Sequence, residues 1–521
     1  MTFDLILKGG WVIDGSGGPP VRADVALLDQ MIADVGRLDA VEAVRVIDVS
    51  GRYVVPGFID AHVHGDLALL ADPIHLPALR QGVTTYLIGQ DGSSFAPASA
   101  PTLDYMRRYT AGFNGNPSSL TYDWRTVDEY LARFDRTVAI NVAYLIPNGN
   151  IRMEVMGLDP RPARDDELRA MQKLVREGMD AGAIGLSTGL DYIPSLYADA
   201  REIAALCEPI VAENGVYVTH MRGYGPRAGA GMSEVFDIVR ASGGVPAHIS
   251  HYNGRADLLL SLIDEGRALG LDLTYDTYPY LAGSTILGMV ALPGWVQQGG
   301  IEPTLERLND QAVRVRLKSE WFAGPTPYAL ESITIAMAAH PDWRWAEGLT
   351  VTAAAAAAGL DPGNFVCDIL VASGMAVGIV GFRPGDRTEA DVRAILRHPA
   401  HMAGSDGIFC GGFPHPRGWG AFARILGYHT RELGDYSWPE AITHLATHAA
   451  RRFRLTDRGL VRPGFVADIV VLDPASVTDR ATYATGRTLA EGVEHVVVNG
   501  TLALENGEPT GATPGRALRR G

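Results

Sequence analysis

Apolar residues in the middle of the chain form short runs that alternate with segments of helical periodicity. Runs of this kind are typical of strands buried on both faces. Residues 165–180 and 233–242 instead repeat their apolar positions at helical spacing. The strand-like runs are residues 53–60, 83–88, 138–143, 183–186, 216–219, 245–249, 271–275 and 401–404. Eight units of strand followed by helix predict an α/β fold, a (β/α)8 TIM barrel.

Both ends of the chain have a different pattern, in which strand-like runs are separated by glycine- and proline-rich turns. These runs are residues 4–7, 11–13, 24–28 and 45–48 at the start, and 467–472 and 495–500 at the end. This pattern of short apolar runs and turn residues predicts strands joined by tight turns. We therefore expect residues 1–54 and 456–521 to build one small β-sandwich from both termini, with residues 55–455 as the barrel.

The gap between the seventh and eighth predicted strands is too long for a single helix. Residues from about 287 to 350 lie in this gap, and they include four tryptophans, Trp295, Trp321, Trp343 and Trp345. We expect this segment to form an insertion over the mouth of the barrel. A segment at the mouth of a barrel lies where active sites of this fold are found.

Composition and charge narrow the class of protein. The chain has 521 residues, which exceeds what one core usually holds, and 47% of them are hydrophobic. Its net charge of −15 argues against nucleic acid or an anionic membrane as a partner. The first residues lack a secretion signal, no apolar run is long enough to cross a membrane, and the three cysteines are widely spaced. We expect a cytoplasmic enzyme with a small-molecule substrate, and the sequence leaves a homo-oligomer open.

Two histidines follow the first barrel strand, in Gly57-Phe-Ile-Asp-Ala-His-Val-His64. Residues i and i+2 at the end of a strand point the same way, so His62 and His64 can present two imidazoles to one point. Zinc and similar divalent metals bind imidazole nitrogen readily. The pair alone is equally consistent with ordinary surface or core histidines. The residues at the other strand ends decide between these two interpretations.

Those other strand ends carry further metal-binding side chains. Asp91 follows the second strand, His220 the fifth, His251 the sixth and Asp406 the eighth. Active sites of such barrels lie at the carboxyl ends of the strands. Each residue alone is more often structural, but four histidines and two aspartates at one face predict ligands for one or two zinc-like ions.

Motifs along nearly the whole chain resemble the amidohydrolase superfamily, and closely its D-aminoacylase (N-acyl-D-amino-acid deacylase) branch. The matching stretches are residues 56–64, 81–85, 185–192, 219–222, 249–251, 278–280, 404–407, 415–417 and 464–474. The resemblance implies a hydrolase of non-peptide C–N bonds that releases a D-amino acid from a linear N-acyl amide. It implies metal-bound hydroxide as nucleophile, with Asp406 as general base and acid.

The resemblance also implies how the substrate binds. Arg417 offers a planar fork suited to a carboxylate, and the family pattern pairs it with Tyr192. Tyr278 is expected to supply a wall or a hydroxyl donor, although packing at the barrel rim is an equal alternative. His248 and His415 are interpreted as structural, Cys410 as an inert thiol, and the glycine-rich residues 223–231 as a mobile loop at the mouth.

This chain departs from the family pattern at two positions. The family places a cysteine ligand in a Gly-Asn-Cys-Gly turn, where this chain has Gly89-Gln-Asp-Gly92, so Asp91 supplies a harder carboxylate. We expect this change to weaken the preference for Zn²⁺ relative to manganese-like ions. The family's Ser-His-His-Lys is Ser250-His-Tyr-Asn253 here, so Asn253 lacks the lysine's charge.

Lysine usage bears on the type of metal centre. The chain has only three lysines, Lys8, Lys173 and Lys318, and the fourth barrel strand ends in Leu186-Ser-Thr188. A carbamylated lysine of the dihydroorotase or hydantoinase type is therefore not expected. Two alternatives stay open. The first is hydrolysis of a cyclic amide or another N-acylated amine, which the loss of lysine at Asn253 favours. The second is a barrel without catalytic activity.

Overall fold

The central body of the protein is a parallel barrel. The computed structural model describes residues 2–38, 41–324, 329–382 and 386–520. The barrel strands are β6 (Phe58–Asp60), β8 (Val83–Ile88), β9 (Asn141–Pro147), β10 (Gly185–Gly189), β11 (Val216–His220), β12 (Ala247–Ile249), β13 (Leu273–Thr277) and β17 (His401–Ala403), paired in chain order. Ala61 N donates to Ala403 O across the seam, and β7 (Val63–His64) pairs with β18 (Gly407–Ile408). The predicted (β/α)8 barrel is confirmed.

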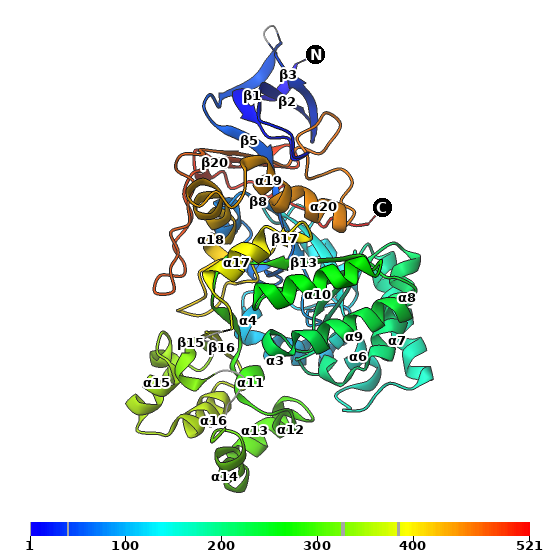
Figure 1. Cartoon of the computed structure of the whole chain (residues 1–521), viewed down its shortest axis with the longest axis vertical. Coiled ribbons are helices and arrows are strands. Elements are labelled where there is room, and N and C mark those ends of the chain that lie inside the picture. The colour runs from blue at the N-terminus through cyan, green and yellow to red at the C-terminus, as the bar shows by residue number, and fades with distance from the viewer. Residues whose placement is uncertain (1, 39–40, 325–328, 383–385, 521) are drawn as a thin grey trace.

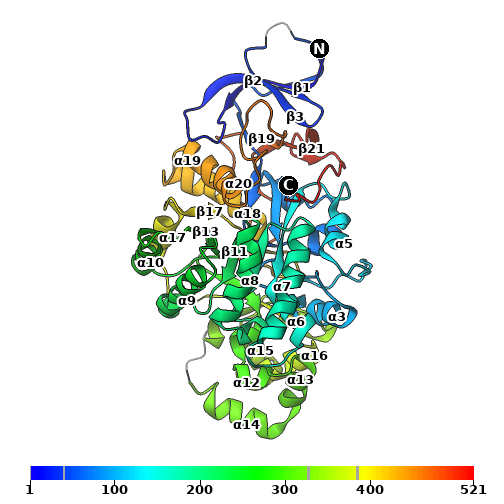
Figure 2. The same cartoon turned by 90° about the vertical axis from the view of Figure 1, so that its right-hand side faces the viewer.

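Helices surround the barrel because its strands are apolar on both faces. Every residue of β8 and β9 is buried, as expected for parallel strands covered inside and outside. Figures 1 and 2 show the outer helices packed around the strands. The longer ones are α3 (Ala100–Tyr109), α6 (Asn148–Met156), α7 (Asp165–Asp180), α8 (Ala200–Ala212), α9 (Ala228–Ala241), α10 (Ala256–Ala268), α17 (Glu389–Leu396) and α18 (Arg417–Arg424). The shorter ones are α1 (Ala68–Ala71), α2 (Leu76–Leu79), α4 (Ala111–Asn114), α5 (Val127–Leu131), α19 (Trp438–Ile442) and α20 (His448–Arg452).

Both chain ends contribute strands to a second sheet, which contains antiparallel and parallel strand pairs. Its strands are β1 (Phe3–Val12), β2 (Val21–Leu28), β3 (Met31–Gly36), β4 (Ala43–Asp48), β5 (Tyr53–Pro56), β19 (Ile469–Leu472), β20 (Val493–Val498), β21 (Thr501–Glu505) and β22 (Glu508–Pro509). The two halves meet where β5 pairs with β19. Leu7, Val25, Leu27, Val54 and Ile469 form part of its core. The predicted module built from both termini is confirmed.

The sequence predicts one strand at residues 53–60, and this prediction is wrong. The run forms two strands that belong to different sheets. β5 belongs to the terminal sheet and β6 to the barrel, and Gly57 separates them. A side chain at position 57 would place its Cβ 2.2 Å from Thr84 Oγ1, so only glycine fits. Gly57 N donates to Asp468 O at 2.8 Å. The same backbone therefore leaves one sheet and enters the other within a single residue.

The predicted insertion between the seventh and eighth barrel strands is present, and it is longer than the expected residues 287–350. Between β13 and β17 the chain forms a small sheet of β14 (Gly283–Ile286), β15 (Ile333–Ala338) and β16 (Val377–Gly381). Its helices are α11 (Leu287–Ala291), α12 (Gly294–Gln297), α13 (Ile301–Asn309), α14 (Gln311–Glu320), α15 (Val351–Ala358) and α16 (Pro362–Ala372). Residues 325–328 of the predicted insertion lie outside the described residues. In Figure 1 the insertion and the terminal sheet occupy opposite ends of the long axis.

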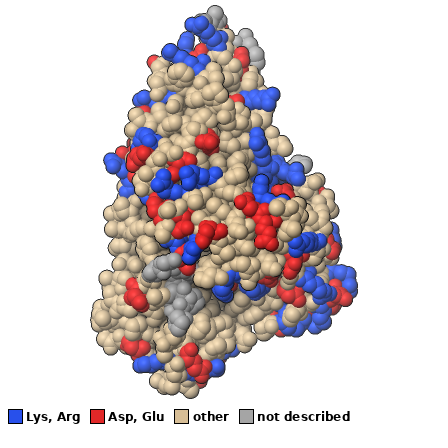
Figure 3. Space-filling view, in the orientation of Figure 1, with Lys and Arg blue, Asp and Glu red and all other residues tan. Residues whose placement is uncertain are grey.

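The surface mixes charges of both signs. On the face seen in Figure 3, basic and acidic side chains are interspersed among neutral ones. Within the described ranges, no single helix has the length and apolarity needed to cross a bilayer. The pair α15 and α16 meets that test only when the two are counted together across an 88° bend.

Candidate metal centre and its pocket

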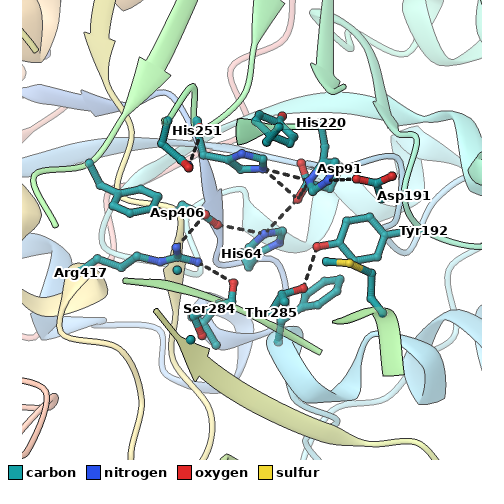
Figure 4. Close-up of a pocket in the computed structure, with 18 of the residues that line it drawn as sticks. His64, Asp91, Asp191, Tyr192, His220, His251, Ser284, Thr285, Asp406 and Arg417 are labelled. Carbon is teal, nitrogen blue, oxygen red and sulfur yellow. Dashed lines mark hydrogen bonds and ion pairs between the residues drawn. The ribbon is translucent and has the colours of Figure 1, made fainter. Parts of the chain in front are cut away.

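The six predicted metal ligands lie together at the carboxyl ends of the barrel strands. His62 and His64 follow β6, Asp91 follows β8, and His220 ends β11. His251 follows β12, and Asp406 follows β17. All six side chains are buried, and Figure 4 shows five of them, His64, Asp91, His220, His251 and Asp406, gathered around one space.

The six residues form three overlapping groups in which the candidate ligand atoms lie within 4.8 Å of one another. The groups are His62, His64 and Asp91; Asp91, His220 and His251; and His62, His251 and Asp406. Asp91 belongs to two groups. Its Oδ1 lies 3.6 Å from His62 Nε2, and its Oδ2 lies 3.6 Å from both His64 Nε2 and His251 Nε2. Asp91 could therefore serve as a ligand in either of these two groups.

Unpaired polar atoms test whether these residues fit a metal ion. Both ring nitrogens of His62 and Asp91 Oδ1 are buried without a hydrogen-bond partner. Leaving such atoms unpaired costs about 1–3 kcal/mol each. Imidazole nitrogen and carboxylate oxygen are the ligands that zinc-like ions accept. The donor set fits a divalent ion, and the residues that would hold it are the six named above.

The electrostatics of the centre are set by charged neighbours that outweigh burial. Burial disfavours a charged imidazole, but the carboxylates of Asp276 and Asp91 raise the pKa of His62 to about 10. Burial also opposes ionisation of Asp406, yet Arg417 and His64 lower the pKa of that carboxyl to about 2. Asp406 is therefore a carboxylate at neutral pH, the form in which it can accept a proton.

Three of the candidate ligands have left-handed backbone conformations. The φ angles are +54° at Asp91, +35° at His251 and +49° at Asp406. Few residues other than glycine adopt this region, and such residues concentrate at functional sites. In each case the chain turns just after a barrel strand. The turns keep the three side chains at the mouth of the barrel instead of letting them follow the strand outward.

The predicted substrate residues line the same pocket as the candidate ligands. Tyr192, Asn253, Tyr278 and Arg417 all border it, together with five of the six candidate ligands. Tyr192 OH lies 2.8 Å from Thr285 Oγ1. Asn253 Nδ2 donates to His251 O. The structure thus brings metal ligands and substrate candidates into one cavity.

Arg417 is engaged within the pocket wall. Its Nη1 forms an ion pair with Asp406 Oδ2 at 2.8 Å, and its Nη2 donates to Ser284 O at 3.0 Å. The guanidinium carbon lies 4.6 Å from the centre of the Tyr278 ring, a cation–π contact. Its Nε is buried without a hydrogen-bond partner. Arg417 therefore touches the candidate base and retains an unpaired donor.

Three carboxylates near the ligands were not singled out from the sequence; Asp60 and Asp276 are buried, and Asp191 is half-buried. Asp191 Oδ2 lies 3.3 Å from His220 Nε2, and Asp276 Oδ2 lies 3.6 Å from His62 Nδ1. Asp60 accepts a hydrogen bond from Ser405 N at 2.8 Å, next to Asp406. Asp276 stands at a strand end, so the same rule that selected His220 applies to it.

The remaining candidates have other surroundings. His248 lies between Thr274 Oγ1 and Asp276 Oδ2, 2.9 Å from each, and His415 Nε2 lies 3.1 Å from Ala282 O. Burial raises the pKa of the Cys410 thiol to about 11. All three lysines lie away from the pocket: Lys8 in β1, Lys173 in α7 and Lys318 in α14.

Residues 223–231, predicted as a mobile loop, form a short 3-10 turn at Gly225–Arg227 and the start of α9. Tyr224 and Arg227 from this segment line the pocket. Whether the segment moves stays a prediction.

Comparisons with known proteins agree with this geometry. The family model described as "Amidohydrolase family" matches residues 45–503. The chain is 35% identical to the D-aminoacylase of Alcaligenes xylosoxydans xylosoxydans over 99% of this chain and 98% of that one. A solved D-aminoacylase structure, described as having a binuclear metal center, aligns with a TM-score of 0.82 and 34% identity, covering 99% of this chain and all of the other.

A second solved structure extends the comparison to a bound inhibitor. N-acyl-D-glutamate deacylase from Bordetella bronchiseptica, complexed with zinc and a phosphonate inhibitor, aligns with a TM-score of 0.83 and 31% identity over the whole of both chains. Because the family model and the full-length relatives cover nearly all of the sequence, the chain belongs to the amidohydrolase family, in its D-aminoacylase branch.

Proposed function

We propose that this protein is a metal-dependent amidohydrolase that deacylates N-acyl-D-amino acids, releasing a carboxylate and a free D-amino acid. The observation that carries the proposal is a cluster of two histidine pairs that share Asp91, with ionised Asp406 beside Arg417, beside one pocket. Its relatives of known activity, a D-aminoacylase and an N-acyl-D-glutamate deacylase, match it from end to end.

The residues of the chain divide the work of amide hydrolysis. The histidines and Asp91 would hold one or two divalent ions, whose chemistry is to acidify water and to polarise a carbonyl oxygen. Asp406 takes the proton from the attacking water and gives it to the leaving nitrogen, because it is a carboxylate at neutral pH and borders the pocket.

The substrate carboxylate is assigned to Arg417 and Tyr192. Arg417 has a buried Nε without a partner, and a guanidinium presents its donors to a carboxylate in a planar fork. Tyr192 borders the same cavity with its hydroxyl held by Thr285. The ring of Tyr278 supports the Arg417 guanidinium through a cation–π contact. Asn253 offers no positive charge where the family has lysine, so Arg417 would be the main anchor.

The proposal also covers which metal the enzyme binds and where in the cell it works. We infer Zn²⁺ as the first candidate, with manganese-like ions favoured more than in relatives because Asp91 is a harder ligand than cysteine. We infer a cytoplasmic location, since Cys207, Cys367 and Cys410 are free thiols. A homo-oligomer stays a prediction from the sequence.

The test is a matched panel of N-acetyl-D- and N-acetyl-L-amino acids, given to metal-reconstituted protein and scored by release of free amine. We expect turnover of the D series only. Turnover of neither series by protein that holds its metal would overturn the proposal. In that case we would test cyclic amides and acylated amines without a carboxylate. The neutral Asn253 side chain would suit such uncharged substrates.

A further inference from the structure

Asp276 touches a member of every candidate ligand group without belonging to any of them. It is the fourth residue of β13 and is fully buried among β6, β12 and β17. Its Oδ2 lies 3.6 Å from His62 Nδ1, and its Oδ1 accepts a hydrogen bond from His251 N at 2.8 Å. Each of the three groups contains His62, His251 or both.

The contact with His62 fixes the direction of an imidazole. His62 Nε2 is the nitrogen that faces Asp91 and Asp406, at 3.6 and 3.7 Å. Nδ1 is left on the opposite edge of the ring, where Asp276 stands behind it. A carboxylate behind the second nitrogen of a metal-binding histidine holds the ring and its tautomer in place.

The contact with His251 fixes a turn. The backbone of His251 has a φ of +35°, which is uncommon for residues other than glycine. Asp276 supports this backbone twice, because its side chain accepts from His251 N and its main-chain oxygen accepts from Tyr252 N at 2.7 Å. This turn places His251 Nε2 3.6 Å from Asp91 Oδ2.

Asp276 is itself held in one orientation. His248 Nε2 lies 2.9 Å from Asp276 Oδ2, and the other nitrogen of His248 lies 2.9 Å from Thr274 Oγ1. On the far side, Gly404 leaves room for the carboxylate, since a Cβ at position 404 would come within 2.7 Å of Asp276 Oδ1. The carboxylate is therefore rigid enough to position two other residues.

We propose that Asp276 is a positioning residue that orients ligands for both candidate metal positions at once. It acts through His62 on the group that contains His64, and through His251 on the group that contains His220. The inference requires that the centre binds metal, and it does not depend on which amide the enzyme cleaves.

Asp191 provides a matched control, because it is a carboxylate that supports one ligand only. Its Oδ2 lies 3.3 Å from His220 Nε2, and His220 belongs to a single group, with Asp91 and His251. Replacing Asp191 should disturb one metal position, whereas replacing Asp276 should disturb both. The difference between the two variants isolates what is particular to Asp276.

The experiment measures metal dissociation constants of the full-length protein by competition with a chelator, using Zn²⁺ and Mn²⁺ as probes. For Asp276→Ala we expect about 10- to 100-fold weaker binding at every position that the wild type fills. For Asp191→Asn we expect a loss of that size at one position at most. Wild-type constants in Asp276→Ala, with only its melting temperature lowered, would overturn the proposal and leave Asp276 a structural residue.

A second variant covers the case in which Asp276→Ala does not fold. Asp276→Asn keeps the shape but has one acceptor oxygen in place of two, so it cannot support His62 and His251 together. We expect weaker metal binding at one position or both. Wild-type constants in Asp276→Asn would likewise contradict the proposal. Because these constants are read without substrate, failure here is distinct from failure of the deacylase assay.

Discussion

Two buried polar clusters in this protein differ in how completely their hydrogen bonds are made. At the junction of the barrel and the terminal sheet, Asp468 accepts from Asn499 N at 2.7 Å and Asn141 Nδ2 at 3.1 Å, and it pairs with Arg458. At the barrel mouth, His62, Asp91 and Arg417 keep buried polar atoms without hydrogen-bond partners.

The difference separates a structural network from a binding site. A closed network of hydrogen bonds rigidifies the fold, whereas unpaired buried atoms are costly unless a ligand completes them. The same residue types therefore serve two purposes here. Aspartate beside arginine anchors the terminal sheet at Asp468 and Arg458, and it forms part of the candidate active site at Asp406 and Arg417.

Replacing one aspartate in each cluster should give opposite results. The larger effect on turnover is expected from Asp406→Asn, which keeps the shape of the side chain and removes its ability to accept a proton. We expect kcat on an N-acyl-D-amino acid to fall about 10²- to 10⁴-fold, measured at saturating metal. An Asp406→Asn enzyme with wild-type kcat would assign proton transfer to another group.

The matching change, Asp468→Asn, should affect stability and not turnover. It leaves Arg458 buried without its carboxylate partner, and loss of one member of a buried pair costs about 3 kcal/mol. We expect the free energy of unfolding in denaturant to fall by about that amount, with kcat per folded molecule unchanged. A large drop in kcat in the folded variant would show that the two clusters are not independent.

A carboxylate outside both clusters, Glu167, is expected to show the smallest effect. Glu167 near the start of α7 accepts from Arg161 at 2.7 Å and from Arg164 N at 2.8 Å, and these contacts lower its pKa from 4.5 to about 2 despite some desolvation. A lowered folded-state pKa adds stability above the unfolded value, and that stability is lost as pH falls from about 4.5 to about 2.

The corresponding variant is Glu167→Gln, followed by thermal melting across this pH range. We expect it to be less stable than the wild type at pH 7, with the two curves converging as the pH approaches 2. A difference that stays constant with pH would mean that shape, and not charge, carries the contribution of Glu167.

The strand ends were the most informative part of the sequence. His62, His220, His251 and Asp406 could be selected because parallel strands of a barrel end at the same face, whatever the loops between them do. The insertion was also predictable, since no single helix could fill the gap before residue 401. These inferences need only the order of strands along the chain.

Other features depend on contacts between distant segments and could not be predicted. The division of residues 53–60 at Gly57 follows from the approach of Thr84, which no local pattern reveals. The pairing of Arg417 with Asp406 joins the first residue of α18 to the turn after β17. The strand-end rule could have selected Asp276, but its contacts with His62 and His251 are known only from the distances.

The switch of sheets at Gly57 also has a consequence for how the protein is made. Strand β5 pairs with β19, and Gly57 N donates a hydrogen bond to Asp468 O. The segment that leads into His62 can therefore adopt its final structure only when residues near the C-terminus are present. Pairings of such long sequence separation form late and slowly. The candidate ligands His62 and His64 leave the ribosome early, yet we expect their segment to be fixed only after the C-terminal strands are made. Loss of those strands during synthesis would leave the start of the barrel unfinished.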